Sequence, residues 1–367
     1  MSSSATIFPR ELRKEIEIAL DITNREGENE NILALGMPGI GKTEIPRCVA
    51  QELGIGFKRL VVPQYDEVDF RGVPKVNERN RTVFYPTEEL PHEDRDGTKG
   101  GILMADELPS GKPGVQIIWH QLMDSGTIGT LYKLPKGWII LATGNRDEDG
   151  AFVHTLPTTV RRRSAVFTLE PNFDDWKKWA LDSQQIEPEI LSFLNKNPNE
   201  FIIFEPDKPA TNYALPSTWH KLAKYTRALK RRGENPGLAA VIARVGEAAG
   251  GKFHGWYKIW KEVPDIDAII TGTEKRIPEK LDIQWCVVSS LTTKLIALEK
   301  DKNLVPASKN VLAYINNMTS DVVMAFLNDI MNTKFWAAQK KNVVKTPEFA
   351  ALTKRHAKNI VGDVDAV

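Results

Sequence analysis

Residues 32–43 read ILALGMPGIGKT, an apolar run followed by a glycine-rich turn that ends in Lys42 and Thr43. Gly36, Gly41, Lys42 and Thr43 satisfy the pattern G-x-x-x-x-G-K-[ST], and the helix-compatible stretch EIPRCVAQEL follows. Glycines let the backbone turn with its N–H groups inward, so these donors and the following helix N-terminus can hold phosphate oxygens. The stretch therefore predicts a phosphate-binding loop between a buried strand and a helix; the alternative is a glycine turn that binds no nucleotide.

The expected ligands of this loop are ATP and Mg²⁺. Lys42 would contact the β and γ phosphates, and the hydroxyl of Thr43 would bind the metal. The residues expected to contact the nucleotide are Gly36, Pro38, Gly39, Ile40, Gly41, Lys42, Thr43, Glu44 and Asp106.

Residues 101–108, GILMADEL, are apolar until they reach Asp106 and Glu107. This pattern predicts a fully buried strand whose carboxyl end carries two carboxylates. Next to a phosphate loop, Asp106 would hold Mg²⁺ together with Thr43, and Glu107 would polarise the attacking water. Acidic residues can also end a strand without a catalytic role, and the preceding phosphate loop favours the functional interpretation.

Residues 138–143, WIILAT, predict another buried strand, which ends beside Asn145. Ligands collect at the carboxyl edge of an open parallel sheet, so Asn145 is expected to orient the hydrolytic water. The alternative is a turn-forming asparagine before Arg146 and Asp147.

Residues 156–163, LPTTVRRR, end in three adjacent arginines. One interpretation is a solvated basic helix end. The other is an arginine that enters the active site of a neighbouring subunit, since the segment follows the Asn145 strand closely.

Composition narrows the function classes. The 367 residues suffice for two or three domains. The chain has 49 basic and 48 acidic residues, so its net charge of +1 gives no overall electrostatic argument for binding to nucleic acid or membranes. Only Cys48 and Cys286 are present, which favours a reducing compartment over a disulfide or zinc framework. There is no apolar signal core and no run of about 18 apolar residues, so we expect a cytoplasmic protein without a membrane span.

The expected fold class is α/β: a parallel sheet flanked by helices, followed by an all-helical lid and a helical C-terminal region. Residues 113–124 predict a helix that buries Ile117, Ile118 and Leu122. After residue 171 strand signals nearly vanish, and helices are expected at 187–196, 217–231, 236–250 and 252–262 among others. The expected domains are 1–172, 173–262 and 263–367.

The order of these motifs resembles that of AAA+ ATPases, and among them the MoxR branch with its bacterial and phage-encoded members. The resemblance covers roughly residues 10–230. It rests on GMPGIGKT (36–43), DFRGVP (69–74), GILMADEL (101–108), TIGTLYKLP (127–135), ATGN (142–145) and LPTTVRRR (156–163). By this resemblance the first and third motifs are the Walker A and Walker B segments, Asn145 is the sensor-1 residue, and residues 63–86 and 126–136 are the helix-2 insert and pre-sensor-1 hairpin.

The resemblance also implies that Arg163 is the arginine finger that acts on a neighbouring subunit. Ser164 replaces the aromatic residue that follows this arginine in the family, and Arg161 and Arg162 compete for the role. Ser217 stands where family members carry the sensor-2 arginine. Either Lys221 or Arg227 substitutes for it, or lid closure is weakly coupled to hydrolysis.

The leading hypothesis is therefore a Mg²⁺-dependent, ring-forming and hexameric ATPase that acts as a MoxR-like chaperone on a protein partner. The resemblance implies a von Willebrand factor A-domain protein as one such partner. A second hypothesis is an ATP-gated assembly scaffold with slow hydrolysis. A third is a nucleic-acid motor, which the near-neutral charge disfavours although residues 161–163 and 230–232 are basic.

Overall fold

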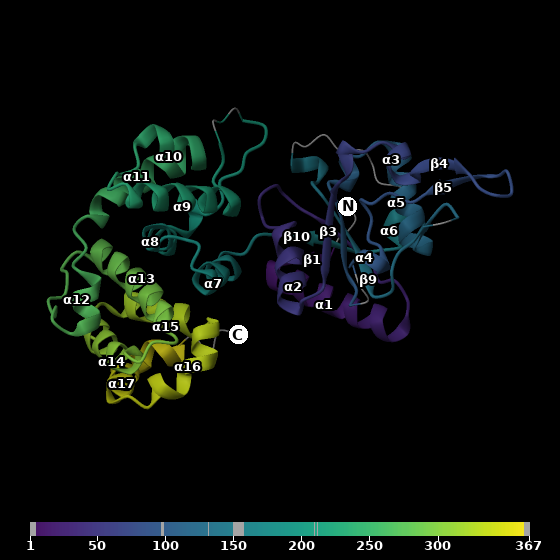
Figure 1. Ribbon diagram of the computed structural model, residues 1–367. Helices are drawn as coiled ribbons and strands as arrows, with labels where there is room; N and C mark the ends of the chain where they lie inside the picture. Colours follow the sequence, from purple (N-terminus) through teal and green to yellow (C-terminus); the bar gives the residue numbers. More distant parts are fainter. Residues whose placement is uncertain are drawn as a thin grey trace. The chain divides into compact units, whose positions relative to one another are not determined.

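The computed structural model describes residues 5–96, 99–130, 132–149, 158–208, 210 and 212–362. The chain forms two compact units, Met1–Asn172 and Phe173–Val367 (Figure 1). Each unit has its own apolar core and is described by itself below. The expected division into 1–172, 173–262 and 263–367 stays a prediction.

The first unit is built on a six-stranded parallel sheet. Its strands lie in the order β1 (Ala5–Ile7), β10 (Ala165–Leu169), β2 (Ile32–Leu35), β9 (Trp138–Gly144), β6 (Gly101–Asp106) and β3 (Gly56–Val61). Each neighbouring pair is parallel, so the carboxyl ends of all six strands lie at one edge of the sheet. The loops after β2, β6 and β9 therefore meet there.

Alternate residues of the central strands face opposite helical layers (Figure 1). In β6, Ile102 and Met104 belong to the apolar cluster that contains residues of α1 and α2. Leu103 and Ala105 belong to a second cluster, which contains residues of α5 and α6. Successive side chains of a strand point to opposite faces, so the sheet is covered on both sides, as the continuous apolar runs predict.

Among the described residues of this unit, six α-helices accompany the sheet. They are α1 (Pro9–Glu26), α2 (Glu44–Leu53), α3 (Glu67–Arg71), α4 (Glu93–Asp96), α5 (Pro113–Ser125) and α6 (Thr158–Arg162). The apolar stripe of α1, with Leu12, Ile16 and Leu20, is buried as its helical spacing predicts.

One sequence-based expectation for α5 is wrong. Ile118 and Leu122 are buried, but Ile117 is 63% exposed. The fully buried residue is Trp119, two positions later and about 200° away around the helix. Because Trp119 is far larger than Ile117, its burial decides which face of α5 contacts the sheet.

Within the described residues, this unit also contains two antiparallel hairpins. The β4 (Val73–Val76) and β5 (Thr82–Tyr85) strands are antiparallel and extend away from the sheet (Figure 1). Strands β7 (Thr127–Ile128) and β8 (Tyr132–Lys133) form a shorter antiparallel pair. Both hairpins fall in the segments that the sequence analysis identifies as an insert and a hairpin.

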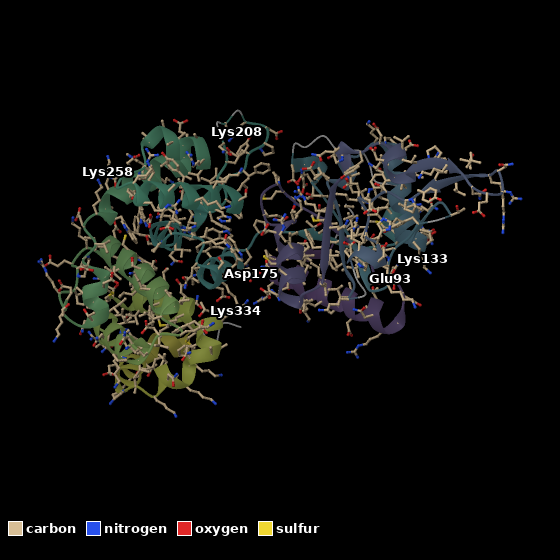
Figure 2. The ribbon with its side chains drawn as sticks, in the orientation of Figure 1. Glu93, Lys133, Asp175, Lys208, Lys258 and Lys334 are labelled. Carbon is tan, nitrogen blue, oxygen red and sulfur yellow. The ribbon has the colours of Figure 1, made fainter. Side chains whose placement is uncertain are left out.

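The second unit is helical. Its helices are α7 (Phe173–Ser183), α8 (Pro188–Lys196), α9 (Pro216–Arg231), α10 (Leu238–Val245), α11 (Glu247–Trp260), α12 (Ile266–Thr271), α13 (Leu281–Ala297), α14 (Leu304–Ile315), α15 (Ser320–Met331), α16 (Lys334–Val344) and α17 (Pro347–Gly362). A continuous apolar core includes residues from α7 through α17. Charged side chains such as Lys208, Lys258 and Lys334 lie on the outside (Figure 2).

The break between α10 and α11 differs from the expected helix boundary near residue 251. The break lies at Gly246, whose φ is +79°. A β-carbon there would also lie 2.4 Å from the carbonyl oxygen of Asn212. The helix therefore ends where a backbone from another segment approaches, which residue spacing within the helix does not reveal.

Both cysteines are free thiols. Within the described ranges, no helix combines the length and apolarity needed to cross a lipid bilayer.

Candidate nucleotide-binding site

The phosphate loop connects β2 to α2 at the carboxyl edge of the sheet. The N–H of Gly36 donates to the carbonyl oxygen of Gly144 at 3.1 Å, which ties the start of the loop to the end of β9. A β-carbon on Gly36 would lie 2.5 Å from the carbonyl oxygen of Leu169, and Gly41 has a φ of +102°. Backbone proximity at Gly36 and backbone conformation at Gly41 thus explain two of the four pattern positions.

Lys42 is held over its own loop. Its Nζ donates to the carbonyl oxygens of Gly36 and Met37 and, at 2.8 Å, to Oδ1 of Asn145. Burial lowers the pKa of Lys42 to about 8, against the opposing effect of the nearby carboxylates of Asp149 and Asp106. An anionic phosphate that replaced these neutral acceptors would stabilise the charged form of this lysine.

Asp106 ends β6 and is almost completely buried. Its Oδ1 accepts a hydrogen bond from the hydroxyl of Thr143 at 2.5 Å. Its Oδ2 accepts from the hydroxyl of Thr43 at 3.4 Å and from Nε of Arg59 at 2.7 Å. The carboxylate is thus held by groups from three other parts of the chain.

The donor set of Thr43 and Asp106 fits Mg²⁺. A hydroxyl and a single carboxylate oxygen are hard ligands, and Mg²⁺ usually completes its shell with substrate phosphates and water. In the part of the chain that the structure describes, there is no group of three or more His, Cys, Asp or Glu side chains that could hold a metal ion. The phosphates of a bound nucleotide would supply further ligands to a metal at this edge.

Glu107 lies just beyond β6 and differs from Asp106 in its surroundings. Its side chain is exposed, and its φ of +58° places a non-glycine residue in the left-handed region. The carbonyl oxygen of Glu107 accepts from the N–H of Ser110 at 2.9 Å, which closes the turn. Its charge also acts on Lys42, where it opposes the lowering of the pKa by burial. This turn directs the carboxylate to the solvent side of the site.

The segment after Asn145 is anchored by Arg146. Nη2 of Arg146 donates to Asp149 at 2.8 Å, and Nη1 donates to Glu170 at 2.7 Å. The hydrogen bond to Asp149 is the main reason why the pKa of Arg146 is raised. Asn145 therefore lies in an anchored turn while its side chain contacts Lys42. Its interpretation as a turn-forming residue is thus compatible with its interpretation as a residue of the site.

The remaining residues that we expect to contact the nucleotide differ in their exposure. Ile40 is buried in the apolar cluster beneath the loop, whereas Pro38 and Gly39 are partly exposed on it. The side chain of Glu44 is exposed and lies 3.5 Å from Arg47. Leu156 and Pro157, which anchor the alignment of Arg163 with the family, lie outside the described residues.

Arg163 does not approach the phosphate loop of its own subunit. It precedes β10, whose first residue pairs with the first residue of β2, and its carbonyl oxygen accepts from Nδ2 of Asn31 at 3.0 Å. Asn31 precedes β2, whereas the phosphate loop follows it, so Arg163 lies at the opposite edge of the sheet. The four residues of β2 separate these edges by roughly 13 Å. Nε of Arg163 donates to Asp124.

Arg59 and Thr143 contact Asp106, but the sequence pattern did not identify either of them as a site residue. Arg59 lies in a short apolar strand, FKRLVV. The position of an arginine near the centre of this strand is the sequence signal that could have identified it. Thr143 ends the run WIILAT and is fully buried. Their relation to Asp106 depends on strand pairing, which the linear pattern does not give.

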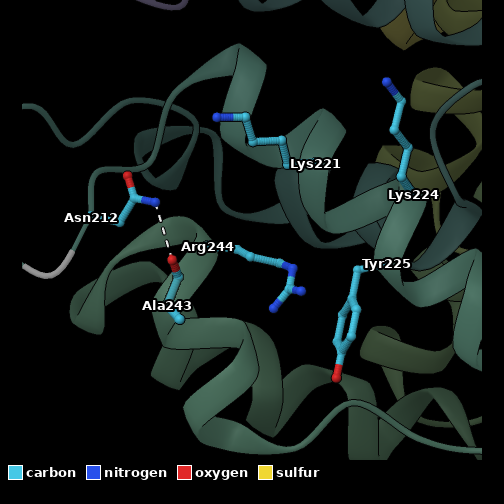
Figure 3. A pocket seen from close by; sticks show the side chains of 6 residues that line it. All are labelled: Asn212, Lys221, Lys224, Tyr225, Ala243 and Arg244. Atoms are coloured by element: carbon cyan, nitrogen blue, oxygen red, sulfur yellow. Dashed lines mark hydrogen bonds between the residues drawn. The ribbon is translucent and has the colours of Figure 1, made fainter.

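A separate basic hollow of about 650 Å³ lies in the helical unit (Figure 3). Its lining residues are Asn212, Lys221, Lys224, Tyr225, Ala243 and Arg244. The guanidinium of Arg244 lies 3.6 Å from the ring centroid of Tyr225. None of the residues expected to contact nucleotide lines this hollow.

The lining of the hollow helps to compare Lys221 and Arg227, the two residues that could replace the sensor-2 arginine. Arg227 is engaged elsewhere, since it donates to Glu187 and to the carbonyl oxygen of Gln185, both at 2.7 Å. Lys221 lines the hollow and forms no ion pair with any residue in the described ranges. Of the two side chains, only Arg227 is thus committed to a structural contact.

No protein-family model matches the sequence. The chain is 21% identical over 271 residues to the Lon protease of Aquifex aeolicus, a match that covers 70% of this chain and 31% of that protein. It is 28% identical over 120 residues to the uncharacterized protein YeaC of Bacillus subtilis, covering 31% of this chain and 35% of that protein. The chain thus spans about a third of the length of these relatives.

Among solved structures, a mutant of RuvB from Thermotoga maritima is similar, with 15% sequence identity and a TM-score of 0.40 over 72% of this chain and 75% of that one. The parallel sheet, the phosphate loop and the acidic end of β6 define the class of this first unit. It has the architecture of a P-loop nucleotide-binding fold and is followed in this chain by a helical unit.

Proposed function

We propose that this protein binds and hydrolyses ATP with Mg²⁺ at the carboxyl edge of its sheet. The observation that carries the proposal is the convergence of Lys42, Thr43, Asp106 and Asn145 from three different loops. Lys42 exchanges its acceptors for phosphate oxygens, and Thr43 and Asp106 supply oxygen ligands to the metal, which neutralises phosphate charge. The residues of the loop from Gly36 to Glu44 hold the phosphates.

Glu107 and Asn145 act on the attacking water in this proposal. The carboxylate of Glu107 is exposed beside the charged Lys42 and polarises the water as a general base. Asn145, held in the turn that Arg146 anchors, orients the same water once phosphate has replaced its contact with Lys42. Hydrolysis then requires both side chains, whereas nucleotide binding requires mainly the loop.

Arg163 completes the site of a neighbouring subunit. Its place at the opposite edge of the sheet removes it from its own nucleotide. In the proposal, it exchanges its contact with Asp124 for the phosphates bound to another copy. An arginine supplied in trans accelerates phosphoryl transfer by about 10³ to 10⁵, so an isolated subunit is nearly inactive. This requirement supports assembly into a ring, which we propose to be a hexamer.

The action on a protein partner follows from the resemblance to the MoxR branch. The β4–β5 hairpin carries exposed apolar side chains, including Val73, Val76 and Phe84, that a partner or neighbouring subunit can cover. A MoxR-like chaperone, working with a client such as a von Willebrand factor A-domain protein in the cytoplasm, is the role that we propose.

The test is ATP turnover against protein concentration, with sedimentation on the same samples, for the wild type, Glu107→Gln and Arg163→Ala. Activity is expected to rise steeply as rings form, and both variants are expected to lose it. Rings that mix the two variants should regain activity, because an intact Glu107 site then faces an intact Arg163. Arg25→Ala is the matched control, because Arg25 pairs with Asp21 on the surface of the same unit. Arg161→Ala tests the competing arginine of the run. Negligible turnover in intact rings, or turnover unaffected by Arg163→Ala, contradicts the proposal.

An ATP-gated scaffold with slow hydrolysis is the second candidate. It is favoured by Ser217 at the sensor-2 position and by the internal contacts of Arg227. Turnover that stays slow in complete rings with nucleotide bound supports this alternative.

A nucleic-acid motor has less support. Nζ of Lys230 donates to Glu187 and Glu189, and Arg232 pairs with Glu234, so much of this basic run is neutralised within the chain. ATP turnover that does not respond to DNA or RNA, with no salt-dependent binding, excludes this role.

A further inference from the structure

Asp106 is contacted by an arginine on the neighbouring strand. Strand β3 pairs with β6 so that Arg59 lies opposite Met104, and Asp106 is two residues further along β6. Residues i and i+2 of a strand share a face, so the side chain of Arg59 reaches Asp106 diagonally along the sheet. Its Nε and Nη2 lie 2.7 and 2.5 Å from Oδ2 of Asp106.

This contact uses the oxygen that faces Thr43. Oδ2 of Asp106 accepts one hydrogen bond from Nε of Arg59 and one from the hydroxyl of Thr43, and Nη2 of Arg59 lies beside it in an ion pair, while Oδ1 accepts from Thr143. A carboxylate has about four acceptor positions, or about two on each oxygen, and both positions on Oδ2 are taken by these two hydrogen bonds. Oδ1 points away from Thr43 to a buried hydroxyl. Metal binding at Asp106 therefore requires Oδ2 to lose a hydrogen bond.

We propose that Arg59 is a resident cation that neutralises Asp106 in the metal-free protein and is displaced from Oδ2 when Mg²⁺ enters with the nucleotide. The inference rests on the proposed function, because it assigns Thr43 and Asp106 to the metal. Arg59 acts through Asp106 and is a positioning residue. Its effect is to set the Mg²⁺ concentration at which nucleotide binds tightly and to prevent Mg²⁺ from binding to the empty site.

The difference in burial explains which partner moves. The side chain of Arg59 is 39% exposed, whereas that of Asp106 is 6% exposed. Arg59 can turn into solvent with its charge hydrated, but Asp106 is fixed by Thr143 within the sheet.

The experiment compares the wild type with Arg59→Gln, Arg59→Lys and Arg25→Gln. Arg25 is a matched control, because it is an arginine of the same unit that pairs with Asp21 on the surface. Binding of ADP that carries a fluorescent methylanthraniloyl group is measured in EDTA and across a Mg²⁺ titration. The melting temperature without nucleotide is measured in EDTA and in Mg²⁺.

In Arg59→Gln, the Mg²⁺ concentration that gives the half-maximal increase in fluorescent ADP binding is expected to fall about tenfold. This change corresponds to the loss of one charge-assisted hydrogen bond that competes with the metal. Affinity in EDTA should stay within about threefold of the wild type, because Arg59 is not assigned to the phosphates. Mg²⁺ alone should raise the melting temperature of Arg59→Gln but not of the wild type. Arg59→Lys, which keeps the charge but not the paired donors, should lie between them.

A Mg²⁺ dependence in both Arg59 variants that equals that of Arg25→Gln overturns the inference. So does an increased Mg²⁺ requirement, which makes Arg59 a helper of the metal and not its competitor. If Arg59→Gln does not fold, Arg59→Lys carries the test. If the wild type binds no fluorescent ADP in either condition, the proposed function fails, and this result is distinct from a failure of the role of Arg59.

Discussion

Nζ of Lys42 in the phosphate loop donates a hydrogen bond to Oδ1 of Asn145, 103 residues later in the chain, at 2.8 Å. The two residues follow β2 and β9, which are neighbours in the sheet. These are the lysine and the amide to which we assign phosphate binding and water orientation, and the contact links them directly. We expect phosphate at Lys42 to replace this contact and to release the Asn145 amide for another partner.

Substitution of Asn145 should separate binding from hydrolysis. Asn145→Ala is expected to lower ATP turnover by about 10- to 100-fold, because the attacking water loses its orientation. The dissociation constant of ADP, measured by fluorescence, should change by less than about threefold, since the loop is intact. Asn77→Ala, at a hairpin turn, is the control. A large loss of ADP affinity with unchanged turnover would instead show that Asn145 acts in nucleotide binding.

Lys221 and Arg227 should respond differently to replacement by alanine. We expect Lys221→Ala to reduce ATP turnover by about tenfold at an unchanged melting temperature, since it would lose a charge that serves phosphate. Arg227→Ala should lower the melting temperature by about 2–4 °C, because Glu187 loses a partly exposed partner worth roughly 1 kcal/mol. Turnover and melting curves of both variants check this. The reverse pattern would assign the sensor-2 role to Arg227.

The packing of α3 against the core predicts that truncation of its two apolar residues, Phe70 and Val68, has different effects on stability. Phe70 is buried, and its ring centroid lies 5.7 Å from that of Trp119, whereas Val68 is 69% exposed. Phe70→Ala should destabilise the first unit by about 3–5 kcal/mol in urea unfolding, as for other large core truncations. Val68→Ala should stay within about 0.5 kcal/mol of the wild type. Equal effects would mean that α3 is not held by the aromatic contact.

Stability of the helical unit should fall at alkaline pH through Cys286. Burial raises the pKa of this thiol from 9.0 to about 12. Between these values the unfolded chain releases the proton and the folded chain retains it, so the unfolded state binds fewer protons and stability decreases as pH rises. Urea unfolding at pH 8 and pH 10 should show a smaller decrease for Cys286→Ala than for the wild type. Cys48→Ala is the control, and an equal decrease in all three proteins would contradict the assignment.

The sequence alone determined the elements whose chemistry is local. The phosphate loop needs glycine at two positions for reasons of backbone conformation and proximity. The acidic pair at 106 and 107 ends a short apolar run that is typical of a buried strand. The change from strands to helices near residue 172 is equally local, because it depends on residue periodicity. These features predicted the α/β fold and the set of residues for the nucleotide site.

Only the tertiary structure decided what these residues contact. The pairing of β3 with β6 brings Arg59 to Asp106, and the start of β10 beside β2 puts Arg163 at the edge opposite the phosphate loop. The buried face of α5 was also decided this way, since the sheet accepts Trp119 and leaves Ile117 exposed. The physical reason is the same in each case: strand order and register bring together residues far apart in the chain, and no local pattern contains that information.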